Sequence, residues 1–460
     1  MHRLLIIADD LTGAADCGMA CVAAGLDTVV VLKDNEPIPS ADVVSVDAAT
    51  RRLSSPHAAE QTARLTRRYL TPQTQILFKK LDSTLRGHVA QEIAAVLSVT
   101  RALHGAQGIA IVAPAFPAMG RTTVGGRQFV RGVPVETTEI WHREALNASA
   151  YLPGRLGEHG LRTTHIDLHT VRSEKRLSDA LAGAKAQHDA VVCDAETDED
   201  LRAIVRAGMT LQTSIVWAGS AGLAAQLPQA IGIGREPWKS ILPSPVHRPT
   251  LFVNGPTLPA NGASLPTNGP LLFVIGSPSQ ASREQIPRLV ADREIESVTV
   301  PLSALRQGVH SATWAEQTRR LDRAFSTGRD IILSPDMGGR SGVDGQSDAN
   351  GQSGADSQSS AHEDATLSPA LAALVSPYVT RCSGLVLTGG ETARSVLDRL
   401  GVATLRLVGE VEPGIPLSVA TVVTPAGSLC LPVVTKAGAF GSPHSLLSCH
   451  DAIRTLRTLT

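Results

Sequence analysis

The sequence is poor in aromatic residues and in net charge, and both shortages bear on the class of partner. Phe, Trp and Tyr together make up 3% of the 460 residues, and the formal net charge at pH 7 is −1. A nucleic-acid-binding chain normally carries a basic field and aromatic side chains on which bases stack. The composition therefore argues against a nucleic-acid partner.

Cysteine pairs and long apolar runs are also missing. No C-x-x-C occurs, so the scattered cysteines are expected to be reduced, mostly buried thiols rather than disulfides or a zinc site. No apolar run approaches the length of a membrane span, and the apolar start of the chain is too short for a signal peptide and ends in carboxylates. We expect a cytoplasmic protein without a membrane partner. The cysteines are Cys17, Cys21, Cys193, Cys382, Cys430 and Cys449.

Several motifs of known enzyme classes do not occur. The sequence has no G-x-x-x-x-G-K-[ST], no H-R-D, no G-x-G-x-x-G directly after a strand, no H-E-x-x-H and no G-x-S-x-G. These absences exclude a P-loop NTPase and a kinase with the protein-kinase catalytic loop.

What the chain does contain is an alternation of apolar runs and helical stretches. With 43% hydrophobic and 18% charged residues, it has enough apolar material for a sizeable core. The alternation predicts βαβ units, so we expect an α/β fold with two domains, mainly parallel sheets and a ligand cleft between the domains. The predicted strands are Leu4–Ala8, Thr28–Leu32, Val43–Val46, Gln75–Lys79, Gly108–Ala113, Ala190–Cys193, Thr213–Ala218, 271–276, 330–335 and 384–389.

Two changes of composition divide the chain. Residues 242–270 are dominated by Pro, Gly and Asn, which predicts a linker between a domain at 1–241 and a second domain at 271–460. Residues 338–364 are rich in Gly, Ser, Asp and Gln and have no apolar period. We expect that stretch to be a mobile surface insertion in the second domain.

The stretch IIADDLTGAAD, residues 6–16, places two carboxylates at the end of the first predicted strand. In open α/β sheets the carboxyl ends of the strands form the ligand edge. Adjacent residues on an extended backbone point in opposite directions, so we expect Asp10 to face the ligand and Asp9 to brace a loop. Asp16 falls inside the following helix, where the structural interpretation is that its side chain bonds a neighbouring loop.

Charged and hydroxyl-bearing residues follow other strands of the first domain. KKLDSTLRGH at 79–88 supplies cations that suit an anionic substrate, and Asp82 is able to accept a hydroxyl proton. Arg51 and Arg121 follow further strands. Each loop alone reads equally well as a solvated, salt-bridged turn. Together they suit a small polyhydroxy acid.

Glycine-rich turns follow strands of the second domain. They are VIGSPSQASREQI at 274–286, LVLTGGETARSVL at 385–397 and the loop VVTKAGAFGSPHS at 433–445, where Lys436 is a candidate to neutralise phosphate charge. Free N–H groups at a helix start favour an anion. Any one of these turns is more simply a tight strand-to-helix connection, but the set favours a nucleotide site.

Six motifs in this order resemble the four-carbon acid sugar kinase family, which phosphorylates threonate, erythronate or 3-oxo-tetronate with ATP. They are ADDLTGAAD, KKLDSTLRG, APAFPAMGRTT, the Gly-Ser turn at 276, LTGGETA and TKAGAFG. The resemblance covers nearly the whole chain except residues 242–270 and 338–364. It implies a sugar-acid-binding N-terminal domain, an ATP-binding C-terminal domain, and transfer to the terminal C4 hydroxyl.

The resemblance also assigns residues. Phosphoryl transfer needs positioning and charge neutralisation, and the phosphates need a hard cation, so Mg²⁺ is expected with ATP and no metal-binding residue is assigned. Asp82 and Asp10 are the candidate catalytic bases. The substrate side is Arg51, Lys80, Ser83 and Arg86, and the nucleotide side is Ser277, Gly389, Gly390, Glu391, Thr392 and Gly438. Where relatives often carry a threonine, GSPSQAS has Ser282 as its candidate replacement.

Two other functions stay open. An aspartyl-phosphate phosphatase or mutase at Asp9 or Asp10 would normally need its aspartates one residue apart, and here they are adjacent. A non-catalytic sugar-acid sensor would need no glycine-rich nucleotide turns. The oligomeric state also stays open, with a homodimer as one expectation, and the stereochemistry of the acid is not fixed by residue order.

Overall fold

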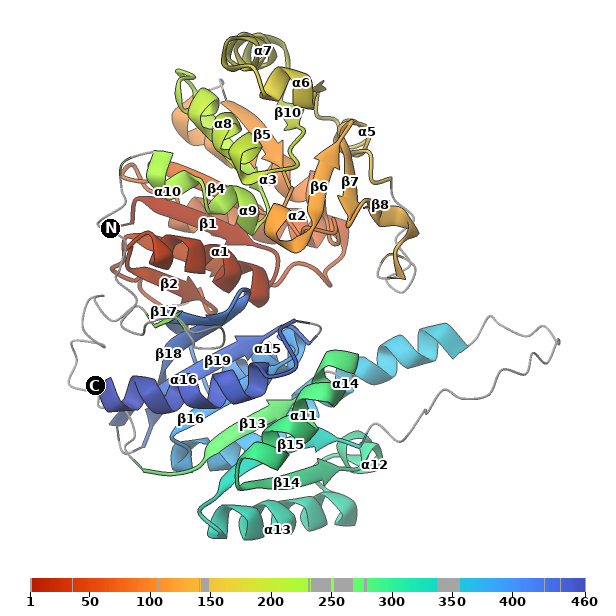
Figure 1. The fold of residues 1–460 in the computed structure, drawn as a ribbon, viewed down its shortest axis with the longest axis vertical. Helices are drawn as coiled ribbons and strands as arrows, with labels where there is room; N and C mark the ends of the chain where they lie inside the picture. Colours follow the sequence, from red (N-terminus) through yellow and green to blue (C-terminus); the bar gives the residue numbers. More distant parts are fainter. Residues whose placement is uncertain are drawn as a thin grey trace, which may run out of the picture. The chain divides into compact units, whose positions relative to one another are not determined.

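The chain forms two compact units in a computed structural model (Figure 1). The first unit comprises Met1–Ser240, Phe252–Pro256 and Thr404–Leu407, and the second comprises Ile241–Leu251, Thr257–Ala403 and Val408–Thr460. The structure describes residues 2–34, 36–105, 108–139, 141, 149–230, 232, 250–251, 268–276, 279–336, 356–425, 427–438 and 440–459.

The first unit is built on a sheet with strand order β17-β2-β3-β1-β4-β11-β5-β10-β9. Every pair in it is parallel except β17 with β2. This confirms the expected α/β architecture. The strands are β1 Leu4–Ala8, β2 Thr28–Val31, β3 Val43–Asp47, β4 Ile76–Lys80, β5 Gly108–Ala113, β9 Thr163–Ile166, β10 Ala190–Cys193, β11 Ser214–Gly219 and β17 Thr404–Glu412.

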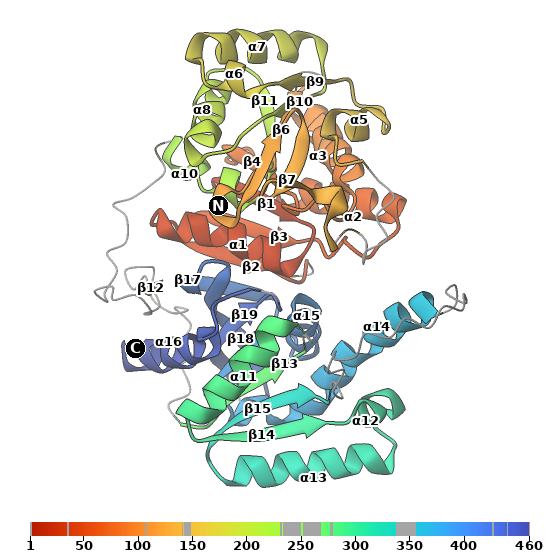
Figure 2. The same cartoon turned by 45° about the vertical axis from the view of Figure 1, so that its right-hand side comes forward.

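Helices cover both faces of this sheet, as the alternation of side chains along each strand requires. In β1, Leu4 and Ile6 join one buried cluster, whereas Leu5 and Ile7 join the other. The first cluster includes residues of α1, α7, α8 and α9, and the second includes residues of α2, α3 and α5 (Figure 2). The helices are α1 Leu11–Ala23, α2 Ser55–Tyr69, α3 Val89–His104, α5 Leu152–Gly157, α6 Leu168–Val171, α7 Glu174–Gln187, α8 Asp198–Met209, α9 Ala221–Ala224 and α10 Leu227–Ala230.

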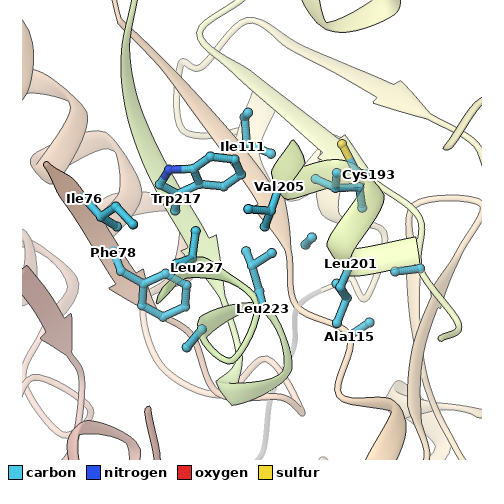
Figure 3. Packing of buried hydrophobic residues seen from close by; sticks show 14 of the residues in the cluster. Ile76, Phe78, Ile111, Ala115, Cys193, Leu201, Val205, Trp217, Leu223 and Leu227 are labelled. Carbon is cyan, nitrogen blue, oxygen red and sulfur yellow. The ribbon is translucent and has the colours of Figure 1, made fainter. Parts of the chain in front are cut away.

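Trp217 of β11 is the largest side chain in the first of these clusters (Figure 3). Gly208 of α8 makes room for it, because a Cβ at that position would lie 2.4 Å from the indole Cη2 atom. Helix α8 therefore packs directly on the sheet. A separate small sheet lies between β5 and α5 in the chain and was not predicted: β6 Arg121–Val124, β7 Arg127–Val130 and β8 Val133–Pro134, with short 3-10 turns at Pro117–Met119 and Val135–Thr137.

The second unit has a sheet of order β14-β15-β13-β16-β19-β18-β17. Its first five strands are parallel, and β18 pairs antiparallel with β19. The strands are β12 Thr250–Leu251, β13 Leu271–Ile275, β14 Ile295–Val300, β15 Asp330–Pro335, β16 Gly384–Thr388, β18 Ile415–Thr424 and β19 Gly427–Lys436. The helices are α11 Gln280–Asp292, α12 Leu302–Gln307, α13 Ala312–Ser326, α14 Asp356–Val375, the 3-10 turn Ser376–Arg381, α15 Gly390–Arg399 and α16 Ser445–Leu459.

Some predictions for this half need correction. The expectation of an unstructured insertion over 338–364 is wrong for residues 356–364, which belong to α14, while 338–355 lie outside the described residues. Strands β14, β17, β18 and β19 were missed, and residues 433–436 of the predicted loop at 433–445 belong to β19. The predicted linker lies almost wholly outside the described residues, apart from β12 and residues 268–270, and the predicted domain boundaries stay a prediction.

All six cysteines are free and buried, as predicted. Within the described ranges, no helix combines the length and the apolar character needed to cross a membrane.

Candidate functional site

Arg51 links the two carboxylates that follow strand β1. Its Nη2 lies 2.7 Å from Asp9 Oδ2, and its Nη1 lies 2.7 Å from Asp10 Oδ2. The prediction that these carboxylates point apart is wrong. The extended backbone ends at Ala8, and Asp10 serves as the N-cap of α1, where its Oδ1 accepts the N–H of Gly13 at 2.8 Å. Asp9 also braces a loop, as predicted, since its carbonyl accepts the N–H of Thr50.

Asp82 extends this cluster on the loop after β4. Arg86 binds it through both ends of the guanidinium, with Nε 2.9 Å from Oδ2 and Nη2 2.8 Å from Oδ1. Arg51 Nη2 lies 3.6 Å from the same carboxylate. Burial on its own would raise the pKa of Asp82, but the positive charges of Arg86 and Arg51 outweigh it and hold the pKa well below its usual value.

Lys80 is the last residue of β4 and lies against the start of α1. A Cβ at Gly13 would lie 3.1 Å from Lys80 Nζ and 2.7 Å from Asp10 Oδ1, so glycine is needed there for the lysine and the aspartate to approach. The Lys80 Nζ donates to the carbonyl of Leu81 at 2.7 Å. Burial lowers its pKa, but the nearby Cys17, Asp9, Asp10 and Asp82 outweigh burial, and the net pKa is raised.

We call Asp9, Asp10, Arg51, Lys80, Asp82 and Arg86 the Arg51 cluster. The structure brings together five residues that the sequence placed on the substrate or catalytic side, and it adds Asp9. The sixth predicted residue, Ser83, is only half-buried, and its carbonyl accepts the side-chain amide of Gln128 at 2.9 Å.

Two buried polar atoms near the cluster have no hydrogen-bond partner within the described part of the chain. They are Asp9 Oδ1, an acceptor, and Arg121 Nε, a donor. Arg121 follows the loop after β5. Burial lowers its pKa, the charge of Asp82 raises it in part, and the charges of Arg131 and Arg86 lower it further. Buried polar groups are normally hydrogen-bonded, so these two atoms are exceptions beside the cluster, and both are themselves buried from solvent.

A buried ion pair beneath the Arg51 loop supports it and was not predicted from the sequence. Glu92, in the first turn of α3, binds Lys79 Nζ at 2.8 Å and accepts the hydroxyl of Thr50 at 2.5 Å. Lys79 is fully buried. Thr50 is the residue before Arg51, so this ion pair fixes the start of the loop that carries the guanidinium. No local motif marks Glu92, because it reads as an ordinary acid at a helix start.

In the second unit, β16 passes through Gly389 into α15. Gly389 has φ +98° and is the N-cap of α15, so it contributes no side chain to the first turn. Thr388 Oγ1, directly before it, is buried without a partner among the described residues. The backbone is therefore open to approach at this helix start, where N–H groups favour an anion.

Thr392 in α15 does not present its side chain to the surface. Its Oγ1 lies 3.0 Å from Ser368 Oγ of α14, and a Cβ at Gly276 would lie only 1.8 Å from Thr392 Oγ1. Gly276 thus has to be glycine so that the turn after β13 packs on α15. Glu391 is exposed, and Ser277 lies outside the described residues.

Lys436 ends β19 next to this turn, since its carbonyl accepts the N–H of Gly389 at 2.8 Å. Its ammonium binds three carbonyls of the following loop, including that of Gly438. That Lys436 neutralises phosphate charge stays a prediction. Only 1% of the residue is exposed, so it would act through the charge of its ammonium rather than by direct contact. Ser282 of α11 is likewise buried and points at the Gly438 carbonyl, 3.4 Å away.

Comparison with known proteins assigns a domain type to each half of the chain. Residues 4–227 match the model of a sugar-binding N-terminal domain, and residues 272–446 match that of a nucleotide-binding C-terminal domain. A D-threonate kinase of Cupriavidus necator is 38% identical over 460 residues, covering 98% of both chains. The chain belongs to the four-carbon acid sugar kinase family. The predicted family, enzyme class and nucleotide use are thereby confirmed.

Further relatives extend the comparison. A D-threonate kinase of Bordetella bronchiseptica is 29% identical over 459 residues and covers 98% of each chain. A solved structure described as a putative tRNA synthase from Salmonella typhimurium LT2 has a TM-score of 0.72 at 20% identity, with 98% of each chain covered. That likeness shows the fold alone. Family membership as a kinase also disfavours the two alternatives, a phosphatase or mutase and a sensor.

Proposed function

We propose that this chain transfers the γ-phosphoryl group of ATP to the C4 hydroxyl of D-threonate. The two full-length relatives compared above both carry the name D-threonate kinase, at 38% and 29% identity. The single observation that carries the proposal in the structure is the Arg51 cluster, in which three aspartates lie among three cations. The cations of the cluster suit the carboxylate of a sugar acid, and its aspartates suit the hydroxyl groups.

The Arg51 cluster supplies charge and positioning. Arg51 and Arg86 are already engaged by aspartates, so they hold Asp9, Asp10 and Asp82 in fixed geometry before substrate arrives. A preorganised arrangement of this kind lowers the cost of orienting a small ligand. Arg121, Lys80 and Ser83 then complete our proposed substrate contacts, together with Arg51 and Arg86.

Of the two candidate bases, Asp10 fits the role better than Asp82. Asp82 binds Arg86 through both oxygens, and its pKa is held well below the usual range by Arg86 and Arg51, so its affinity for a proton is low. Asp10 is the more exposed of the two, at 26% against 10% of the side chain. A loose phosphoryl-transfer transition state asks little of the base, so we assign Asp82 to positioning and Asp10 to accepting the hydroxyl proton.

The nucleotide is proposed to bind at the turns after β13, β16 and β19. The residues predicted to line it are Gly389, Gly390, Glu391, Thr392, Gly438 and Ser277, all assigned from the sequence. Gly389, with φ +98° at the N-cap of α15, leaves the helix start without a side chain, which fits a phosphate group there. Mg²⁺ would be held mainly by the phosphates and would neutralise the developing charge. Among the described residues no group of three His, Cys, Asp or Glu side chains is placed to hold a metal on its own.

The test is a panel of initial rates for ADP formation with D-threonate, L-threonate, D-erythronate and the 3-oxo acids, in the presence of Mg²⁺. The proposal predicts the highest kcat/KM with D-threonate, and phosphorus NMR of the product should place the new phosphate on C4. A higher kcat/KM with another acid would replace D-threonate as the substrate. Phosphate on C2 or C3 would reject the assigned position. The predicted cleft between the domains and the predicted homodimer stay predictions.

A further inference from the structure

The Lys436 ammonium is enclosed by the backbone of the loop that follows it. Its Nζ lies 3.2 Å from the carbonyl oxygen of Ala437, 3.2 Å from that of Gly438 and 2.9 Å from that of Phe440. Within the described residues no carboxylate forms an ion pair with it. This set of backbone oxygens around one positive charge is the environment that proteins offer to a bound monovalent cation.

Helix α11 and strand β17 hold the same loop from other sides. Ser279 Oγ donates to the Gly438 carbonyl at 2.6 Å, and Gln285 Nε2 donates to the carbonyls of Phe440 at 3.3 Å and Ser442 at 2.8 Å. Glu412 accepts the N–H of Ser442 at 2.9 Å. The loop carbonyls are therefore turned inward by several donors, of which Lys436 is the only charged one among the described residues.

The inward carbonyls fix the direction of the neighbouring N–H groups. In a trans peptide the C=O and the following N–H point in opposite directions, and the described chain has no cis peptide. The N–H groups of Gly438 and Gly441 hence point away from the ammonium. Neither has an acceptor among the described residues. The loop thus has two N–H donors without an acceptor among the described residues, and it begins directly after Lys436, whose carbonyl accepts the N–H of Gly389 at 2.8 Å.

We propose that the Lys436 side chain acts as a built-in monovalent cation, which turns the loop carbonyls inward and so presents the loop N–H groups to the phosphates of the nucleotide. This inference rests on the proposed nucleotide site and concerns a positioning residue, since the ammonium touches the loop and not the ligand. Its charge is what matters, because an apolar side chain of equal length would fill the space without attracting the carbonyls.

The arrangement makes nucleotide binding sensitive to pH. Burial lowers the pKa of Lys436 to about 8, although the facing groups Glu412 on β17 and Cys449 on α16 act to raise it. As the pH rises through that value the amine loses its charge and one of its three donors. Affinity for the nucleotide should therefore fall between pH 7 and pH 9.5.

The experiment is a calorimetric titration of ADP into the full chain, using wild type, Lys436→Ala, Lys436→Met and the exposed control Lys175→Met. Both Lys436 variants should bind ADP about tenfold more weakly or worse, as expected for the loss of charge-assisted hydrogen bonds. Adding propylammonium, which replaces the atoms missing from Lys436→Ala, should restore affinity in that variant. It should not do so in Lys436→Met, where the methionine side chain fills the space.

The outcomes separate this inference from the proposed function. If wild type binds no ADP, the nucleotide site itself is wrong. If wild type binds ADP and both Lys436 variants bind it as tightly as wild type does, the cation role is overturned. It is also overturned if propylammonium restores ADP affinity equally in Lys436→Ala and Lys436→Met. If the Lys436 variants do not fold, the pH dependence of wild type decides. An ADP affinity of wild type that stays constant from pH 7 to 9.5, with the same result for Lys175→Met, would also overturn the cation role.

Discussion

The two units each end a central parallel strand in a buried lysine, and they hold the two ammonium groups in different ways. Lys80 at the end of β4 is surrounded by acidic groups, and their charges raise its pKa despite burial. Lys436 at the end of β19 is surrounded by backbone carbonyls, and burial lowers its pKa to about 8. Position in the fold is the same, but the neighbours decide whether the charge is strengthened or weakened.

This difference matches the two ligands that we propose. A small hydroxy acid needs fixed acceptors and cations at short range, which the Arg51 cluster supplies through paired side chains. A nucleotide phosphate is a larger anion that the outward N–H groups of a loop and a helix start are suited to bind. The comparison therefore predicts that changes to charged pairs damage the first unit, whereas changes to backbone geometry damage the second.

Removing the central cation of the first unit should have the largest effect. Arg51→Met leaves the buried Asp9 and Asp82 and the partly exposed Asp10 without their shared partner. We expect kcat/KM for the sugar acid to fall about a thousandfold, on the order of 4 kcal/mol. Steady-state rates of ADP formation measure it, and the exposed neighbour Arg52→Met is the matched control. A loss below tenfold would mean that the cluster is not the substrate site.

Breaking the ion pair beneath the cluster should mainly cost stability. Glu92→Gln leaves the fully buried Lys79 without its carboxylate, and an uncompensated buried charge costs about 3 kcal/mol or more. Urea unfolding followed by circular dichroism measures the loss. The double variant Glu92→Gln with Lys79→Met should recover part of it, because the unpaired charge is gone. An undiminished loss in the double variant would show that charge is not the cause.

Gly276→Ala tests the second unit through geometry without changing any charge. The added Cβ would lie 1.8 Å from Thr392 Oγ1, so the turn or the start of α15 must shift, at about 1–3 kcal/mol for overpacking. Calorimetry should find weaker ADP binding with sugar-acid binding retained. Gly183→Ala in α7 is the control, because its Cβ would meet nothing within 4 Å. Equal ADP affinity in Gly276→Ala and wild type would reject the turn as part of the nucleotide site.

The smallest effect concerns Asp16, which makes no ion pair among the described residues. Burial raises its pKa to about 6, and the charge of Lys80 offsets this only in part. Because the folded state then binds this proton more tightly than the unfolded state, the stabilising contribution is present near pH 4 and is lost as the pH rises through about 6. Asp16→Asn should therefore be more stable than wild type at pH 7 by about 1–2 kcal/mol.

The measurement is chemical unfolding of both proteins at pH 7 and pH 4. The advantage of Asp16→Asn should shrink toward zero at the lower pH. An advantage of equal size at both values would mean that desolvation of the charged carboxylate is not its origin.

The sequence predicted the central parallel strands because continuous apolar runs bounded by polar residues mark buried strands. Leu4–Ala8, Gly108–Ala113 and Ala190–Cys193 match their predicted bounds. Strands β17 and β18 were missed because the prediction relied on continuous apolar runs bounded by polar residues. β17 alternates in burial along its length, a pattern that itself marks a half-buried strand, and β18 follows it after only a two-residue turn. Local patterns carry no information on which distant strand will pair with them.

The candidate site was predictable where its residues are adjacent in the chain and not where they meet only in three dimensions. The loop with Asp82 and Arg86 is visible in the sequence as a dense polar stretch. The Glu92 contact to Thr50 joins residues far apart in sequence, and the enclosure of Lys436 depends on carbonyl directions that residue order does not encode. The sequence predicted that Lys436 neutralises phosphate charge, but it did not predict the contacts of its ammonium with the loop carbonyls.

The main claim is that the first unit binds the sugar acid and the second unit binds the nucleotide. Its test is to measure the affinities for the sugar acid and for ADP separately, by calorimetry, in wild type, Arg51→Met and Gly276→Ala. We expect Arg51→Met to lose D-threonate binding and keep ADP binding, and Gly276→Ala to lose ADP binding and keep D-threonate binding. Loss of both ligands in each folded variant, or of neither, would contradict it.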